Sequence, residues 1–237
     1  AGPVGAGRFQ GRTAARCHAD EAQARRIALQ IIQTTIVCAP DRLREFLRNM
    51  TRMKLIRTLA AWRPDLTGYR EVEEAYKVAL KSLARRYLEL HDEVADLDDM
   101  IEAIVTDLAP ELIASNGVGL NSAAQLLLTA GDNPERLRSE ASFAALCGVS
   151  PVSASSGKTT RHRLNRGGDL AADSALHVIA IGRLRLNPKT REYVSRRIAE
   201  GHSKLEAIRC VKRYIAREIF NVIARRHKQI NQAQIAA

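Results

Sequence analysis

A long run of apolar residues at alternating spacings of four and three constrains the fold more than any other feature. It consists of Tyr76, Leu80, Leu83, Tyr87, Leu90, Val94, Leu97, Ile101, Ile104 and Leu108. A repeat of about 3.5 residues keeps one stripe in contact only if the helix pairs with another helix. The partner can be residues 20–61 of the same chain or a second subunit. We expect both, in a coiled-coil hairpin that also makes the protein a homo-oligomer.

The same helix carries an acidic stretch that could be a metal site or a solvated face. It comprises Asp92, Glu93, Asp96, Asp98 and Asp99. Val94 and Leu97 occupy the buried positions among these acids, so the pattern favours a solvated face.

The rest of the chain also favours helices. Aromatic residues make up only 4% of the sequence, and hydrophobic residues make up 46%, which is typical of a globular, mainly α protein. Apolar positions recur at helical spacing over 20–38 and again over 40–61. We expect an irregular lead-in over 1–16, a helical coiled-coil region over 17–109 and a C-terminal domain over 110–237.

Gly117-Val118-Gly119 separates two apolar stretches and resembles the turn of a helix-hairpin-helix. In that motif the glycines let the backbone approach a DNA phosphate, and the N–H groups opening the second helix bind its oxygens. An ordinary tight turn with Val118 in its core is the alternative.

Residues 147–169 are rich in serine and glycine and carry four cations, Lys158, Arg161, Arg163 and Arg166. This composition excludes a helix interior and predicts a basic, exposed loop. A hydroxyl beside several cations suits serine chemistry on a phosphodiester. A solvated linker is the alternative.

Positive charge is concentrated in the C-terminal third. Residues 152–237 hold eighteen Lys or Arg against six Asp or Glu, within a chain of net charge +11. We therefore expect nucleic acid as the partner and no membrane.

A final helix is predicted to open at Ser203 and Glu206, which have capping-box spacing. Its inward stripe is Leu205, Ile208, Val211, Ile215, Ile219 and Val222. Its DNA-binding face is Arg209, Lys212, Arg213 and Arg217. An apolar helix over 170–186 should be buried, with His177 packed or hydrogen-bonded.

The four cysteines show no C-x-x-C spacing, and no segment has the pattern of a signal peptide or a membrane span. These features predict an intracellular protein in a reducing cytosol.

Five stretches in a fixed order resemble the C-terminal transposase domain of the insertion-sequence one-ten family, the Piv-like DEDD transposases and DNA invertases. They are the Gly-Val-Gly hairpin at 117–119, the run 143–151, the Ser156-Gly157 pair, the basic stretch ending at 165–168 and the tail 212–218. The resemblance covers roughly residues 70–223.

This resemblance implies a two-part active site. A RuvC-like domain would hold divalent metal with four acidic residues, and the C-terminal domain would contribute a serine. That serine corresponds to Ser156, with Ser155 as the alternative, and Asn165 falls in the DNA-binding stretch. The implied function is cleavage and rejoining of DNA by a transposase or site-specific recombinase, guided by a structured bridge RNA. The implied location is the bacterial cytoplasm, in association with the nucleoid.

The sequence departs from the family pattern at its start. Residues 1–16 contain no Asp or Glu, and Asp20 and Glu21 fall on an expected helix rather than after a strand. We assign no metal ligand and expect Mg²⁺ only together with a complete RuvC-like domain. The alternative function is an inactive, truncated transposase that only binds nucleic acid or dimerises with the intact enzyme.

Overall fold

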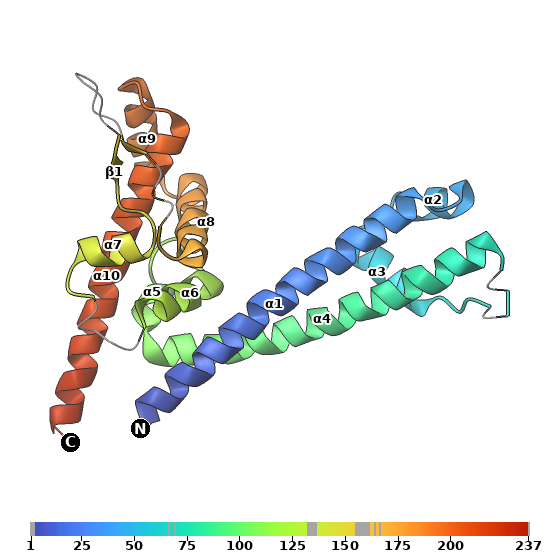
Figure 1. Ribbon diagram of the computed structural model, residues 1–237, viewed down its shortest axis with the longest axis horizontal. Coiled ribbons are helices and arrows are strands. Elements are labelled where there is room, and N and C mark those ends of the chain that lie inside the picture. Colours follow the sequence, from blue (N-terminus) through green and yellow to red (C-terminus); the bar gives the residue numbers. More distant parts are fainter. Residues whose placement is uncertain are drawn as a thin grey trace. The chain divides into compact units, whose positions relative to one another are not determined.

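The computed structural model describes residues 3–65, 67–68, 70–131, 137–154, 162–163, 165 and 167–236, and nearly all of them are helical (Figure 1). The chain separates into two compact units, one of residues 16–99 and one of residues 1–15 together with 100–237. The mainly α fold class is confirmed. The expected division at residues 109 and 110 stays a prediction.

The unit of residues 16–99 is built from most of the long helices α1 (Pro3–Val37) and α4 (Val72–Leu108), with the short helices α2 (Asp41–Leu47) and α3 (Arg52–Ala61) between them in sequence. Figure 1 shows α1 and α4 running alongside one another in this unit. Four helices contribute its buried core: Ala28, Ile32, Leu47, Ile56, Leu59, Leu80, Ala84, Tyr87 and Leu90. Leu80, Tyr87 and Leu90 of the seam predicted on α4 are therefore packed against residues 20–61 of the same chain.

Helix α1 begins at Pro3, so the prediction of an irregular lead-in over 1–16 is wrong for residues 3–16. Proline is well tolerated in a first helical turn. The alanines and arginines of this stretch have high helix propensity, which outweighs its three glycines.

The single helix expected over 40–61 is divided into α2 and α3. Arg48 is still helical, but Thr51 is extended, with φ −65° and ψ 153°, and starts a new helix. The break lets Leu47 of α2 and both Ile56 and Leu59 of α3 reach the same core. Helix α3 ends at Ala61, as expected from Pro64.

The acidic stretch of α4 lies on a solvated face, as predicted, with Asp92, Glu93, Asp96 and Asp99 exposed. Asp98 is half-buried, and its Oδ1 lies 3.0 Å from Nε2 of His18 on α1.

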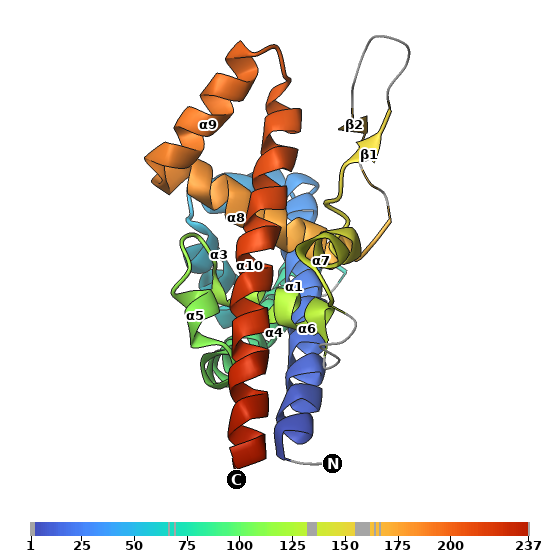
Figure 2. The same cartoon turned by 90° about the vertical axis from the view of Figure 1, so that its left-hand side faces the viewer.

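The second unit is organised around α10 (Lys204–Ala236). Figure 2 shows this helix running the length of the unit, with α7 (Glu140–Leu146), α8 (Leu170–Leu186) and α9 (Pro188–Ala199) packed on it. Helix α6 (Leu120–Ala130) packs on α8, and α5 (Pro110–Ile113) is a single turn beside both α6 and α10. The fully buried core side chains include Leu112, Leu126, Phe143, Leu176, Ile179, Ile215 and Ile219.

The stretch 147–169, expected to be a loop, contains a short antiparallel ribbon. Strand β1 (Val152–Ser153) pairs with β2 (His162–Arg163), so that Val152 lies opposite Arg163 and Ser153 lies opposite His162. Residues 155–161, 164 and 166 lie outside the described residues.

Two helices bury different faces from those expected. Among the described residues, α8 packs against α6, α9 and α10, and His177 and Val178 face away from these contacts and are exposed. On α10, Leu205 lies in the first turn, before the helix meets its neighbours, and it is 67% exposed. Lys212 is only 5% exposed because α8 and α9 both pack on α10, which makes the buried arc wider than one stripe.

Candidate nucleic-acid interface

The base of the β1–β2 ribbon is fixed by three closely packed glycines. The N–H of Asp169 donates to the carbonyl of Leu146, 2.7 Å away, which joins the end of α7 to the start of α8. Gly148 and Gly168 have φ of +70° and +94°. A Cβ on Gly168 would lie 2.5 Å from the Gly148 nitrogen, and one on Gly148 would lie 2.7 Å from the Gly167 oxygen. Only glycine fits this contact without displacing backbone.

The side chain of Asp169 links α8, which follows the ribbon, to α6. Its Oδ1 caps α8 by accepting from the N–H of Ala171 at 2.8 Å, and its Oδ2 accepts from the hydroxyl of Thr129 on α6 at 2.6 Å. Such a cap satisfies N–H groups that would otherwise lack a partner. The carboxylate therefore has a structural role at the end of the Ser/Gly stretch.

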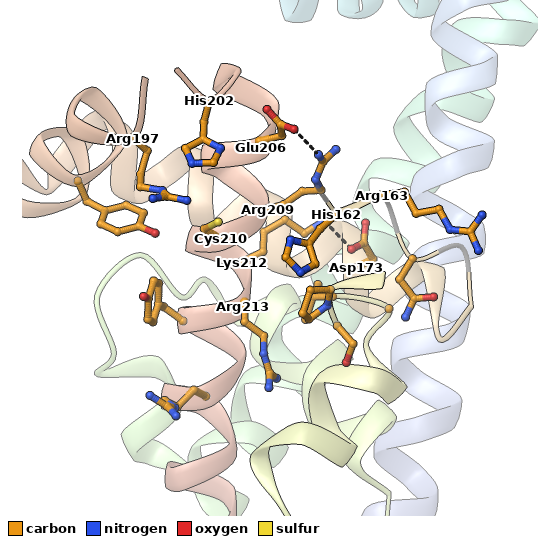
Figure 3. A pocket seen from close by; sticks show the side chains of 18 of the residues that line it. His162, Arg163, Asp173, Arg197, His202, Glu206, Arg209, Cys210, Lys212 and Arg213 are labelled. Atoms are coloured by element: carbon orange, nitrogen blue, oxygen red, sulfur yellow. Dashed lines mark hydrogen bonds and ion pairs between the residues drawn. The ribbon is translucent and has the colours of Figure 1, made fainter. Parts of the chain in front are cut away.

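A cavity of about 820 Å³ opens beside the ribbon, and we call it the basic groove (Figure 3). Its lining comes from residues 148–151 between α7 and β1, from strand β2 and Asn165, and from α8, α9, α10 and the turn between α9 and α10. The cationic side chains that line it are Arg163, Arg196, Arg197, Arg209, Lys212, Arg213 and Arg217, with His162 and His202. The acidic ones are Asp173, Glu200 and Glu206. The surplus of cations gives the groove a positive field.

Several of these cations are positioned by ion pairs. Lys212 is held by Asp173 of α8, and Arg209 lies 3.8 Å from Glu206 within α10. Both pairs are drawn in Figure 3. Lys212 is buried and paired with Asp173, whereas Arg209 is partly exposed. The DNA contact of Lys212 stays a prediction.

Glu140, the first residue of α7, holds a second part of α10 in place. Its carboxylate pairs with Arg217 and accepts from Asn221, while its carbonyl accepts from Arg213 at 3.1 Å. The hydrogen bond from Arg217, followed by that from Asn221, keeps the pKa of Glu140 below its ordinary value although partial desolvation opposes this. Arg217 remains 60% exposed at its side chain.

Cys147, which precedes the ribbon, is fully buried. Burial, with smaller contributions from the charges of Asp169 and Asp173, raises the pKa of its thiol to about 12. A thiol with this pKa is protonated at neutral pH and is a poor nucleophile.

The predicted DNA-binding residues fall into three groups. Those that the structure brings together in the basic groove are Arg163, Asn165, Arg209, Lys212, Arg213 and Arg217. Those that lie outside the described residues are Lys158, Arg161 and Arg166, together with both candidate serines, Ser155 and Ser156. Gly117 and Gly119 do not line the groove.

Gly117 lets the backbone lie close to α8. It has φ +74°, and a Cβ there would lie 3.0 Å from Cγ of Arg183. The Arg183 guanidinium donates to the carbonyl of Asn116 at 2.8 Å and pairs with Glu218 of α10 at 2.7 Å. Gly119 precedes α6, and a Cβ added there would have no atom within 4 Å among the described residues, while Val118 is buried as expected. The helix-hairpin-helix contact with a phosphate stays a prediction.

The sequence analysis missed the α9 side of the groove. Tyr193, Arg196 and Arg197 are spaced three and four apart, which places them on one helix face. Arg196 lies over the Tyr193 ring, 5.5 Å from its centroid. That spacing is the signal in the sequence that could have found them.

The family resemblance implies Mg²⁺, which needs several donor side chains close together. Among the residues that the structure describes, no three His, Cys, Asp or Glu side chains lie close enough together to hold an ion. The described donor set therefore does not fit a divalent metal, and we assign no step to one. In the same part of the chain, no helix has the length and apolar character needed to cross a membrane.

Comparison with known proteins shows what the segment that contains the ribbon is similar to. Residues 109–195 match the family model "Transposase IS116/IS110/IS902 family". This segment runs from the start of α5 into α9 and includes the ribbon. The resemblance drawn from the sequence is confirmed, because residues 109–195 are similar to the transposases of this family.

A particular relative is the "Insertion element IS110 uncharacterized 43.6 kDa protein" of Streptomyces coelicolor. The two are 29% identical over 134 residues, which cover 55% of this chain and 33% of the relative. The chain thus matches about a third of the length of that curated relative.

Proposed function

We propose that this chain binds DNA in the basic groove and, through Ser156, joins covalently to a strand end during DNA transposition. One observation carries the proposal: the groove is lined by both ends of the segment that contains Ser156. Pro151 precedes that segment, His162 and Arg163 follow it, and all three line the groove beside the arginines of α10. The transposase domain covers the same residues.

The chemistry proposed for Ser156 is a reversible phosphoryl transfer. The serine oxygen attacks the phosphorus of a DNA phosphodiester, a serine–phosphate bond forms, and the bond from phosphorus to one sugar oxygen breaks. The hydroxyl proton passes to the departing sugar oxygen, and rejoining reverses these changes. Cations near the phosphate would stabilise the charge that develops on its oxygens. Arg163 and Arg209 are two described groove residues suited to this role, because both are at least partly exposed.

Covalent capture tests this proposal. The chain is incubated with a DNA junction carrying a radioactive strand end, with and without a supplied RuvC-like domain and Mg²⁺, and protein–DNA adducts are separated under denaturing conditions. We expect an adduct that Ser156→Ala abolishes and Ser153→Ala, an exposed serine on β1, leaves in place. An adduct lost only with Ser155→Ala would move the nucleophile by one residue. Salt-sensitive DNA binding without an adduct under any condition would contradict the catalytic part and assign this chain to binding alone.

Two further partners belong to the proposal. A structured guide RNA would select donor and target sequences, and a homo-oligomer would form through the coiled-coil region. The family resemblance supports the RNA, and the long seam on α4 supports helix pairing. Sequencing of RNA that copurifies with the chain tests the first, and sedimentation velocity tests the second. If preparations without RNA still select the same DNA sequences, the guide RNA is contradicted. If the chain is a monomer at all concentrations, the homo-oligomer is contradicted.

A further inference from the structure

Two tyrosines meet on the α9–α10 side of the basic groove. The ring centroids of Tyr193 and Tyr214 are 5.6 Å apart, and the ring planes are at 88° to one another. Both line the cavity. The chain has only five tyrosines, four phenylalanines and one tryptophan, so an aromatic pair among arginines in one cavity is a specific feature. Edge-to-face packing of this kind fixes both rings.

The two rings differ in exposure. Tyr193 is half-buried, and Arg196 lies over its ring. Burial, followed by the neighbouring Cys210 and Tyr214, raises the pKa of the Tyr193 hydroxyl to about 12, so it stays neutral at physiological pH. Tyr214 is 51% exposed. Tyr193 therefore supports Tyr214, and the surface offered to a ligand belongs mainly to Tyr214.

The residues around this pair favour a nucleotide over an apolar ligand. Arg197 and Arg217 line the same cavity. The Nε atom of Arg197 is buried and has no hydrogen-bond partner among the described residues, although its NH1 pairs with Glu200. A ring flanked by arginines is the combination that holds a base and its neighbouring phosphates.

A base inside duplex DNA cannot stack on the tyrosine pair. Inside a duplex both faces of each base are covered by neighbouring bases, so an aromatic side chain can stack only on a base that is unpaired or unstacked. The charged part of the groove suits either form of DNA, whereas the tyrosine pair is useful only for single-stranded DNA.

We infer that the α9–α10 end of the basic groove holds one unpaired base of a DNA strand stacked on Tyr214, with the flanking phosphates held by Arg197 and Arg217. This inference rests on the proposed function, because it assumes that the groove binds DNA. It adds that the bound DNA is locally single-stranded.

The test uses the full chain and a DNA duplex with a short single-stranded flap that contains 2-aminopurine, whose fluorescence falls when it stacks. We expect the wild-type chain to quench the flap and to bind it more tightly than the blunt duplex. Tyr214→Ala should remove the quenching and weaken flap binding roughly tenfold, while blunt-duplex binding stays unchanged. Tyr214→Phe keeps the ring and should behave like the wild type.

Phe46→Ala is the matched control, because Phe46 is also an exposed aromatic residue, 58% accessible, but lies on α2 outside the groove. Quenching that survives Tyr214→Ala would overturn the inference and leave the proposed function in place. Failure of the wild-type chain to bind either DNA would instead overturn the proposed function. Tyr214-dependent quenching of an RNA flap but not of a DNA flap would overturn DNA as the occupant.

Discussion

Gly168 lies where the two ends of the stretch 147–169 meet, and the backbone atoms around it leave no room for a side chain. Gly168→Ala should lower the free energy of unfolding by about 3 kcal/mol, because the residue combines φ +94° with contacts below 3.0 Å to three backbone atoms. Each kcal/mol lowers Tm by about 2–4 °C in a chain of this size. Thermal unfolding followed by circular dichroism measures the change.

Gly201→Ala is the matched control for this substitution. Gly201 also has positive φ, +91°, but no atom of the described residues lies within 4 Å of the added methyl group. The cost should therefore be about 1 kcal/mol, from backbone strain alone. Equal losses for the two variants would show that the packing of Gly148 against Gly168 does not hold the ribbon.

Cys147 gives a second prediction for a single residue. With a pKa of about 12, only about one thiol in ten thousand is ionised at a pH of about 8. Iodoacetamide should therefore label the exposed Cys17 and Cys38 of the native chain quickly and leave Cys147 unlabelled. Mass spectrometry of the digested chain measures this, and unfolding in urea should make all of them reactive. Rapid labelling of Cys147 in the folded chain would contradict its burial.

Helix α7 is tied to α10 through Glu140, and this link should depend on pH. The folded-state pKa of Glu140 lies below the ordinary value of 4.5, so its stabilising effect is fully present above that pH. The effect is lost as pH falls through the folded pKa. We expect the wild type to melt at a higher temperature than Glu140→Gln near neutral pH, and the two curves to converge on acidification.

Glu192→Gln controls for the loss of one carboxylate, because Glu192 is exposed on α9. Its melting temperature should follow the wild type over the same pH range. A constant difference between wild type and Glu140→Gln down to a pH of about 3 would show that the carboxylate charge is not what joins α7 to α10.

The elements differed in how far the sequence could predict them. The α4 helix was predictable because its apolar repeat extends over most of its length, and the ends of α3 and α7 were predictable from Pro64 and Gly148. The break between α2 and α3 was not predictable, since both halves carry apolar residues at helical spacing and only the shared core requires a turn. The ribbon has two residues in each strand, too few for an alternating pattern to show.

The residues of the groove also differ in how far the sequence could predict them. The sequence identified Arg163, Arg209 and Arg217, because a surplus of cations over acids is visible without a fold. It could not show that Lys212 is buried, since that follows from the angle at which α8 crosses α10 and from the partner Asp173. Nor could it bring Tyr193 and Tyr214 together, because they lie on different helices.

At the scale of the whole molecule, charge is distributed unequally along the chain. Residues 152–237, which supply most of the groove lining, hold eighteen Lys or Arg against six Asp or Glu, and the residues before them hold slightly more acids than Lys and Arg. A surface that neutralises phosphates releases counterions, so its affinity falls steeply with salt. Cationic side chains outside the groove should not contribute to the salt dependence of DNA affinity.

The most direct test of the account is the salt dependence of duplex DNA binding. The double variant Arg163→Gln/Arg209→Gln removes two groove cations. The control Lys54→Gln/Arg57→Gln removes two exposed cations from α3. Fluorescence anisotropy at several salt concentrations gives the slope of log affinity against log salt, to which each phosphate contact contributes about 0.9. We predict that the groove variant loses about two units of slope and the control none; equal slopes for both variants would show that DNA does not bind in the groove.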